Sequence, residues 1–256
     1  MIEILQWSAL VVCGVVALAR VPDALKGHNR SIFGAFLLST FAILLSINEP
    51  YLAVDAFLGG ANYANLLLRF LVYGATVLAG YRIAKAFGDC TGARRVAGPV
   101  GLTVLAAVAM ATAVFFLLAD TKGSATGLTG LPLRSATNAI LVNLYAAAGR
   151  VYPAYIAACL LPATVHAVRG RFPASIRAGA VLLSAGFAGL IVAALYAFVP
   201  TDPARLQAVF NFTAVLCLSI GLAVIWIAGL IARRRGRGSA AGQLPGPQKW
   251  SATTRR

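Results

Sequence analysis

The chain alternates between long apolar stretches and short polar breaks from its start to about residue 232. A helix needs about 20 apolar residues to cross a bilayer whose hydrocarbon layer is about 30 Å thick. Seven stretches approach or exceed that length, and we predict a helix in each: residues 4–19, 32–48, 62–86, 99–118, 136–166, 178–199 and 207–232. Backbone in lipid must satisfy its own hydrogen bonds, and a barrel strand has only about 10 residues. The predicted fold class is therefore all-α, a polytopic bundle of seven transmembrane helices.

A shorter element is predicted between the second and third of these helices. Pro50 opens a stretch of aromatic and aliphatic residues, Tyr51 to Leu58, which Gly59 and Gly60 close. Proline suits the first turn of a helix, and glycine suits its end. We expect a short helix that lies at the outer membrane surface or forms a lid over the bundle.

Composition supports a membrane location. Hydrophobic residues make up 60% of the chain and charged residues 11%, whereas a soluble domain is about a quarter charged. The mean hydropathy is +0.83. These values exclude a water-soluble protein, and we expect a multi-pass protein of the cell (plasma) membrane.

The distribution of charge predicts the orientation. The net charge is +15, and most of the 22 Lys and Arg follow the first, third and fifth predicted helices or lie in the tail. Glu3 comes before the first helix and Arg20 follows it, the reverse of a cleaved signal peptide, so we expect that helix to be retained. Because Lys and Arg concentrate on the cytoplasmic side, we predict the N-terminus outside and the C-terminus in the cytoplasm.

The C-terminal residues differ from the rest in composition. Residues 233–256 are rich in Gly, Ser, Pro and Arg, without apolar periodicity. We predict two parts, a seven-helix transmembrane domain at 1–232 and a basic disordered cytoplasmic tail at 233–256. The basic run at its start is typical of an anchor at anionic lipid, and the location of the charge argues against nucleic acid as a partner. Protein partners are not indicated by any motif.

The sequence lacks the residues that several reactions of membrane proteins require. No lysine lies in the last predicted span, where a retinal Schiff base would form, and His28 and His166 lie at helix ends rather than at haem-ligand positions. The chain has no HExxH motif, and its four cysteines are far apart in sequence. We therefore expect no metal, no cofactor and no enzymatic activity.

The two arginines deep inside predicted spans are the strongest candidates for a binding site. Arg69 lies in the third helix and Arg150 in the fifth, and a charge near mid-bilayer costs at least about 2.5 kcal/mol on insertion scales. Residues spaced by three or four share a helix face. The proposed ligand-binding set is Asn62, Asn65, Arg69 and Tyr73 on the third helix, with Asn143 and Arg150 on the fifth.

No acidic residue lies deep in a predicted span, so any carboxylate partner must come from the outer rim, where Glu49, Asp55 and Asp120 are located. Two interpretations follow. The arginines could form an internal network that holds the outer loops, or they could form an outward-facing pocket that binds a carboxylate or phosphate of a small ligand.

The fifth helix also contains a candidate hinge. Pro153 has no N–H to give to the carbonyl of Gly149, and proline commonly bends a helix. Gly149 and Pro153 are thus the predicted hinge beside Arg150, and the alternative is a static kink.

A resemblance rests on two short segments. Residues 55–62, Asp-Ala-Phe-Leu-Gly-Gly-Ala-Asn, lie between the second and third helices, and Ile176-Arg177-Ala178-Gly179, Gly186 and Tyr196 mark the sixth. Together they resemble an actinobacterial family of seven-helix integral membrane proteins provisionally labelled as transporters. Its members usually continue into a cytoplasmic C-terminal domain, and we expect none after Arg237 here. The resemblance implies a seven-helix fold and supplies no substrate residue.

Two functions remain open at this point. The first is a small-solute transporter, or a transporter-like protein, with an outward-facing polar pocket. The second is a receptor-like sensor or signalling-partner module without enzymatic activity. The solute, the coupling ion and the oligomeric state have no signature in the sequence.

Overall fold

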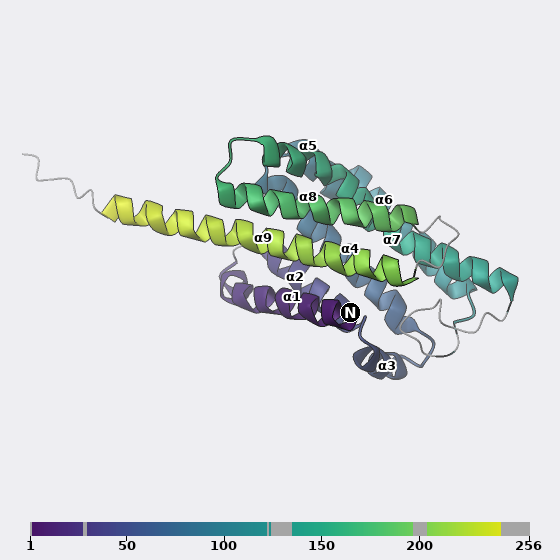
Figure 1. The fold of residues 1–256 in the computed structure, drawn as a ribbon. Coiled ribbons are helices and arrows are strands. Elements are labelled where there is room, and N and C mark those ends of the chain that lie inside the picture. The colour runs from purple at the N-terminus through teal and green to yellow at the C-terminus, as the bar shows by residue number, and fades with distance from the viewer. Residues whose placement is uncertain (1, 28–29, 122, 124–134, 197–203, 242–256) are drawn as a thin grey trace, which may run out of the picture.

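The computed structural model describes residues 2–27, 30–121, 123, 135–196 and 204–241. The part described is all-α (Figure 1). Its helices are α1 (Ile2–Leu25), α2 (Arg30–Leu44), α3 (Asn48–Phe57), α4 (Tyr63–Ala86), α5 (Cys90–Ala97), α6 (Pro99–Leu118), α7 (Ala136–Arg169), α8 (Ala174–Leu195) and α9 (Ala204–Ala241). The predicted all-α class is confirmed, and each of the seven predicted stretches corresponds to a helix.

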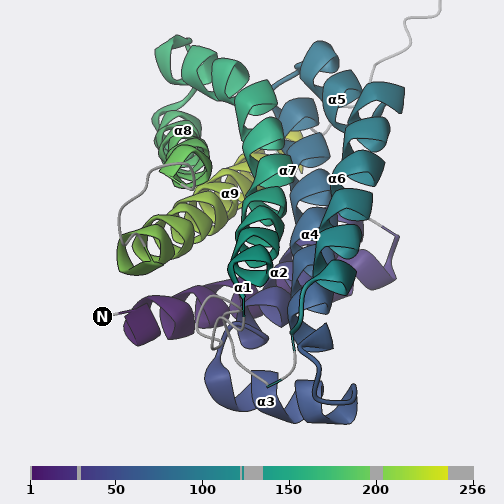
Figure 2. The same ribbon diagram turned by 90° about the vertical axis from the view of Figure 1, so that its right-hand side faces the viewer.

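Six helices form a closed ring. In order around it, α1 packs on α2, α2 on α4, α4 on α7, α7 on α8, α8 on α9, and α9 again on α1. The sixth predicted span, α8, lies on one side of α7, and α6 lies on the other side, outside the ring (Figure 2). Because the ring closes, the inward faces of its helices surround a common space in the interior of the bundle.

Six helices of the described chain are long and apolar enough to cross a membrane, or up to seven if the bent pair of α2 and α3 counts as one span. The axes of α2 and α3 differ by 93° across a break of a few residues. At the break, Ser46 Oγ donates to the carbonyl of Ile43 at 2.6 Å, and Pro50 lies in the first turn of α3. The hydroxyl competes for a helical carbonyl, and the chain turns there. The predicted short helix after the second span is confirmed, and Gly59 and Gly60 both have positive φ.

Helices α8 and α9 approach closely through glycines. A Cβ atom on Gly179 would lie 3.0 Å from the carbonyl oxygen of Gly221, and one on Gly186 would lie 2.7 Å from Cγ of Leu218. Small residues at such positions let helix backbones pack tightly where the hydrophobic effect gives no drive between helices. Gly179 and Gly186, two of the positions that carry the resemblance, thus have a structural role here.

Several predicted boundaries differ from the structure. Helix α2 ends at Leu44, four residues before the predicted end at residue 48. Helix α1 continues to Leu25, so Arg20 lies inside a helix and not in the following loop. The loop expected after the third span contains α5, which begins where the Asp89 carboxylate accepts a hydrogen bond from Gly92 N at 2.8 Å. Helix α9 runs to Ala241, past the predicted boundary at residue 232. The rest of the predicted tail, residues 242–256, lies outside the described residues, and disorder stays a prediction.

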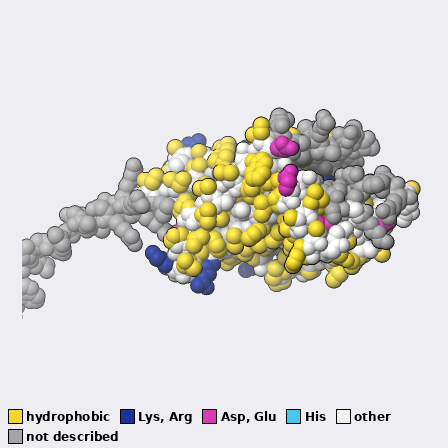
Figure 3. All heavy atoms as spheres, turned by 90° about the horizontal axis from the view of Figure 1, so that it is seen from below, with side chains coloured by type: hydrophobic (Ala, Val, Ile, Leu, Met, Phe, Trp, Pro, Cys, Tyr) yellow, Lys and Arg dark blue, Asp and Glu magenta, His cyan; other side chains and the backbone are white. Residues whose placement is uncertain are grey.

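Charged side chains separate along the bundle. On the face shown in Figure 3, Lys and Arg side chains gather toward the end at which α9 finishes, and Asp and Glu side chains lie toward the opposite end. Hydrophobic side chains cover much of the region between them. Exposed apolar residues of the bundle include Val15, Leu102 and Met110. This arrangement is typical of a protein whose basic end faces the cytoplasm. The orientation itself stays a prediction.

Candidate functional site

The helix ring encloses a cavity of about 400 Å³. Its walls come from α2, α4, α7, α8 and α9, elements far apart in the sequence. Arg69 and Arg150 both line it, together with Asn65, Gly149 and Pro153. Five residues of the predicted site therefore meet at one place. A volume of this size lies within the range of ordinary small-molecule pockets.

Arg69 crosses from α4 to the surface of α7. Its guanidinium lies so near Gly149 that a Cβ atom there would come within 2.6 Å of Nη1. Its Cζ atom lies 5.4 Å from the ring centroid of Tyr145, and its Nε is buried and, within the described structure, has no hydrogen-bond partner. Gly149 is therefore required where it is because any side chain would displace the guanidinium. The sequence analysis assigned this glycine to a hinge and missed that role.

Asn65 lies one turn before Arg69 on the same helix. Tyr145 OH donates a hydrogen bond to Asn65 Oδ1 at 2.7 Å, and both residues are buried. Tyr145 thus contacts Arg69 through its ring and Asn65 through its hydroxyl. One tyrosine of α7 therefore contacts two of the polar residues that α4 contributes to the cavity.

Arg150 follows Gly149 directly on α7. Because Arg69 lies on α4, the two arginines line the cavity from neighbouring helices. Pro153 is buried one turn further on and lines the same cavity. Helix α7 continues without interruption from Ala136 to Arg169 through both of its prolines. The location of the predicted hinge next to the cavity is therefore established, and its movement stays a prediction.

The predicted site did not include the other polar residues that line the cavity. They are Ser39 of α2, Ser46 in the break after α2, Thr76 of α4, and Asn211 and Ser219 of α9. The signal was present in their spacing, because residues seven or eight apart lie on the same helix face. No Asp, Glu, His or Lys occurs among the described residues that line the cavity. The formal charge of the lining is therefore positive.

Asn62 belongs to a different site, at the outer end of α4. It is fully buried with φ of 61°, and its Nδ2 donates to the carbonyls of Thr121 and Gly123, each at 2.6 Å. Tyr51 OH donates to its Oδ1 at 2.6 Å. The Asp55 carboxylate accepts from the backbone N–H of Asn62 and of Ala64, both at 3.1 Å. These bonds join α3, α4 and the segment after α6, a structural role unlike the predicted contact with a ligand.

Tyr73 and Asn143 also lie away from the cavity. Tyr73 is buried behind it, where its hydroxyl contacts Thr112 Oγ1 at 2.8 Å and donates to the carbonyl of Ala148 at 3.4 Å. Asn143 is exposed. The predicted polar residues lie on helices α4 and α7 as expected. Helical spacing, however, does not indicate which neighbouring helix each residue meets or whether the cavity reaches it. The part of the prediction that placed all six residues in one pocket is not what the structure shows.

The proposed rim carboxylates have separate environments. Glu49 is exposed in the first turn of α3, and the side chain of Asp120 is exposed after α6. The backbone N–H of Asp120 donates to Asn138 Oδ1 at 2.8 Å, which ties the end of α6 to the start of α7. Asp55 caps α4, as described above. Asp55 and Asn62 therefore form a hydrogen-bonded network at this end of the bundle, and the predicted network of the two arginines with these carboxylates stays a prediction.

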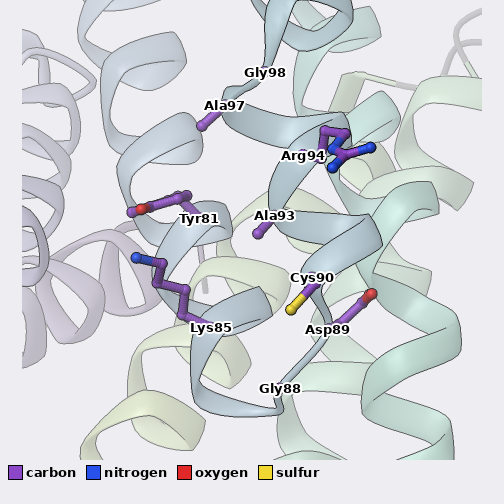
Figure 4. A pocket seen from close by; sticks show the side chains of 9 residues that line it. All are labelled: Tyr81, Lys85, Gly88, Asp89, Cys90, Ala93, Arg94, Ala97 and Gly98. Carbon is purple, nitrogen blue, oxygen red and sulfur yellow. The ribbon is translucent and has the colours of Figure 1, made fainter.

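A second hollow lies at the basic end of the molecule, between the end of α4 and α5 (Figure 4). Lys85 Nζ lies 4.8 Å from the ring centroid of Tyr81, and Arg94 points to the other side of α5. Cys90, at the start of α5, is exposed. Exposed basic side chains beside an aromatic ring are typical of the headgroup layer of a membrane. We regard this hollow as part of that interface.

Comparison with models of known protein families, with curated proteins and with solved structures gives no match. The resemblance to the seven-helix family therefore gains no support from these comparisons. The observations establish a polytopic, multi-helix membrane protein with six candidate spans in its described part, or seven with the bent pair.

Proposed function

We propose that the protein binds a small anionic solute in the central cavity and carries it across the cell (plasma) membrane. The observation that supports this most directly is that Arg69 and Arg150 line one cavity inside the helix ring. The proposal agrees with the resemblance to a family labelled as transporters, but it rests on the cavity.

Electrostatics favours an anion as the occupant. Two like charges that face a shared space of low dielectric repel each other, and an anion between them turns that repulsion into two attractions. Guanidinium groups match the geometry of carboxylate and phosphate, to which they donate paired hydrogen bonds. Asn65 and Asn211 add polar groups to the lining of the same cavity. A small carboxylate or phosphate compound is therefore the ligand class that we propose.

The lining also argues against chemistry on the ligand. General acid–base or nucleophilic catalysis needs a titratable side chain near the reacting atoms. Among the described lining residues, the only ionisable side chains are the two arginines, which stay protonated at neutral pH. We accordingly propose binding and movement of the solute without its conversion.

The receptor-like alternative is favoured by one observation. Toward the basic end the cavity is lined by Ile83, Phe187 and Leu222, which are apolar. A sensor needs a pocket that opens on one side only, whereas a transporter must open this apolar end during its cycle. The two functions thus differ in whether Ile83, Phe187 and Leu222 separate.

Binding is tested by thermal unfolding in detergent with inorganic phosphate, sulfate, lactate and succinate as probes at constant ionic strength. An anion at 100 times its Kd stabilises the folded state by about 2.7 kcal/mol. We expect Arg150→Gln and Arg69→Gln to weaken that binding by about 10- to 100-fold, because a hydrogen bond to a charged group contributes about 1.5–3 kcal/mol. Arg171→Gln, which changes an exposed arginine, is the matched control. Equal anion-induced stabilisation of all three variants would contradict the proposal. A lower unfolding temperature of Arg69→Gln and Arg150→Gln without a change in anion affinity would support a purely structural network.

Transport is then separated from sensing in reconstituted vesicles. The anion that stabilises the protein is placed outside, and its uptake is measured with and without an opposing gradient. Saturable uptake that Arg150→Gln abolishes supports the transporter. Binding without any flux supports the sensor.

A further inference from the structure

Arg20 is a buried arginine, whereas Arg69 and Arg150 are partly buried, and no step described so far uses it. It lies on α1, and its side chain is 2% exposed. Its Nε and Nη1 atoms are both buried and, in the described structure, have no hydrogen-bond partner. The sequence analysis counted this residue among loop charges because the predicted helix ended one residue earlier.

Two aromatic rings hold the side chain in place. Arg20 Cζ lies 4.5 Å from the ring centroid of Trp226 on α9 and 5.8 Å from that of Phe36 on α2. Stacking on a ring uses the face of the planar guanidinium, whereas its N–H groups point outward in its plane. The rings therefore stabilise the charge without satisfying its donors.

The position of this arginine connects it with the central cavity. Phe36 lines the cavity at its basic end, and Leu222, one helical turn before Trp226, lines it as well. Arg20 thus lies directly beyond the apolar end of the cavity. Asp23 and Arg82 are the charged groups that act on it electrostatically, one attracting and one repelling.

Within the described structure, no protein group accepts a hydrogen bond from Nε or Nη1 of Arg20 in the plane of its guanidinium, and this has an energetic cost. Each unsatisfied buried donor costs about 1–3 kcal/mol, more when the donor is charged. Cation–π contacts contribute about 2 kcal/mol each when desolvated. They offset the burial of the charge only in part, and an acceptor with negative charge would satisfy both the N–H groups and the electrostatics.

We propose that Arg20 forms a second anion-binding site, at the inner end of the cavity, for a phosphate or carboxylate group. This inference rests on the proposed function, which supplies the ligand. The solute that Arg69 and Arg150 hold would reach Arg20 after Phe36 and Leu222 separate. A lipid phosphate from the neighbouring headgroup layer has the same chemistry and is the other source.

Trp226 supplies a direct reporter for this site. The chain has three tryptophans, Trp7, Trp226 and Trp250, so Trp7→Phe with Trp250→Phe leaves Trp226 as the only one. The protein in detergent is titrated with inorganic phosphate and with succinate at constant ionic strength. We expect a saturable change in Trp226 emission with at least one of them. Arg20→Gln abolishes it, Arg20→Lys weakens the apparent affinity about tenfold, and Arg150→Gln leaves it in place.

The outcomes separate this site from the central one. No saturable change in the single-tryptophan protein, or a change that Arg150→Gln removes and Arg20→Gln does not, overturns the proposal. If Arg20→Gln does not fold, the weakened binding of Arg20→Lys, with an unchanged unfolding temperature, still decides it. A response to phosphatidylglycerol in the micelle, without one to phosphate or succinate, supports the anion site and overturns its link with the cavity. Failure of the central site is seen separately, as equal anion-induced thermal stabilisation of Arg150→Gln and Arg171→Gln.

Discussion

At the scale of single residues, the central cavity depends on a missing side chain. Gly149→Ala would bring a Cβ atom within 2.6 Å of Arg69 Nη1, so the guanidinium must move away from α7. We expect the affinity for the stabilising anion to fall about tenfold, which corresponds to about 1.4 kcal/mol. The measurement is the concentration of anion that gives half of the maximal shift in unfolding temperature.

The matched control for this change is Gly229→Ala on α9. A Cβ atom there would meet no atom within 4 Å. Alanine raises helix stability by about 0.5–1 kcal/mol relative to glycine, so both variants share that effect. Equal anion affinity of the two variants would show that Gly149 does not position Arg69.

The outer rim provides a prediction about stability. Asn62→Ala removes the side chain that bonds to Thr121, Gly123 and Tyr51, and it places alanine at a φ of 61°. Buried groups that lose their partners cost about 1–3 kcal/mol, so we expect the free energy of unfolding to fall by about 2–3 kcal/mol. Denaturant unfolding in mixed micelles measures it.

Asn143→Ala is the control for that variant, because Asn143 is exposed. An exposed substitution of this kind changes stability by no more than about 0.5 kcal/mol. A comparable loss in both variants would contradict the structural role of Asn62.

The same two asparagines show what sequence reasoning at this scale could achieve. The sequence predicted which residues are polar and which helix face carries them. For Asn65, Arg69 and Arg150 that was enough, because all three line one cavity. Their neighbours could not be predicted, because contacts such as those of Asn62 with Thr121 come from a segment far away in the chain. Helical spacing thus indicates which face carries the polar residues, but it identifies neither their burial nor their partners.

At the scale of helices, the contact between α8 and α9 determines part of the cavity wall. Gly186→Ala would place a Cβ atom 2.7 Å from Cγ of Leu218, which itself lines the cavity. Overpacking of this kind costs about 1–3 kcal/mol. We expect a net loss of about 1 kcal/mol in the free energy of unfolding, after the gain in helix propensity, measured in mixed micelles.

Gly14→Ala on α1 provides the comparison. Its Cβ atom would lie 3.9 Å from Thr40 Cγ2, an ordinary contact distance. That variant should be as stable as the unchanged protein or slightly more so. If Gly186→Ala matched it, the two helices would have room that the structure does not show.

Helix positions were the most predictable feature of this chain, because lipid requires long apolar segments with internal hydrogen bonds. Short elements were predicted less well. Helix α5 has only 8 residues and several polar ones, so its apolar pattern is weak. The end of α1 was missed because Arg20 interrupts the apolar run, and burial between aromatic rings on α2 and α9 is a tertiary effect.

At the scale of the whole molecule, the orientation has a test based on a native residue. Cys90 is exposed at the basic end, and Cys13 is buried. With the C-terminus in the cytoplasm, a membrane-impermeant maleimide should label Cys90 only after the cells are opened. Cys90→Ser controls for labelling of the remaining cysteines.

The opposite end is examined with Phe57→Cys in the Cys90→Ser background. Phe57 is 89% exposed at the end of α3. The same reagent should label this variant in intact cells. The reverse pattern at the two ends would place the basic end outside and would remove the reason for calling the cavity outward-facing.

The brevity of α2 has a consequence for the surrounding lipid. Its 15 residues extend about 22 Å, less than the hydrocarbon thickness of about 30 Å. Because α3 turns by 93° instead of continuing the span, lipids beside this pair must compress their acyl chains or tilt to meet it. The energy of that hydrophobic mismatch depends on acyl chain length, so thin bilayers favour the bent conformation and thick ones oppose it. Membrane thickness thereby acts on the same helix that contributes Phe36 and Ser39 to the cavity.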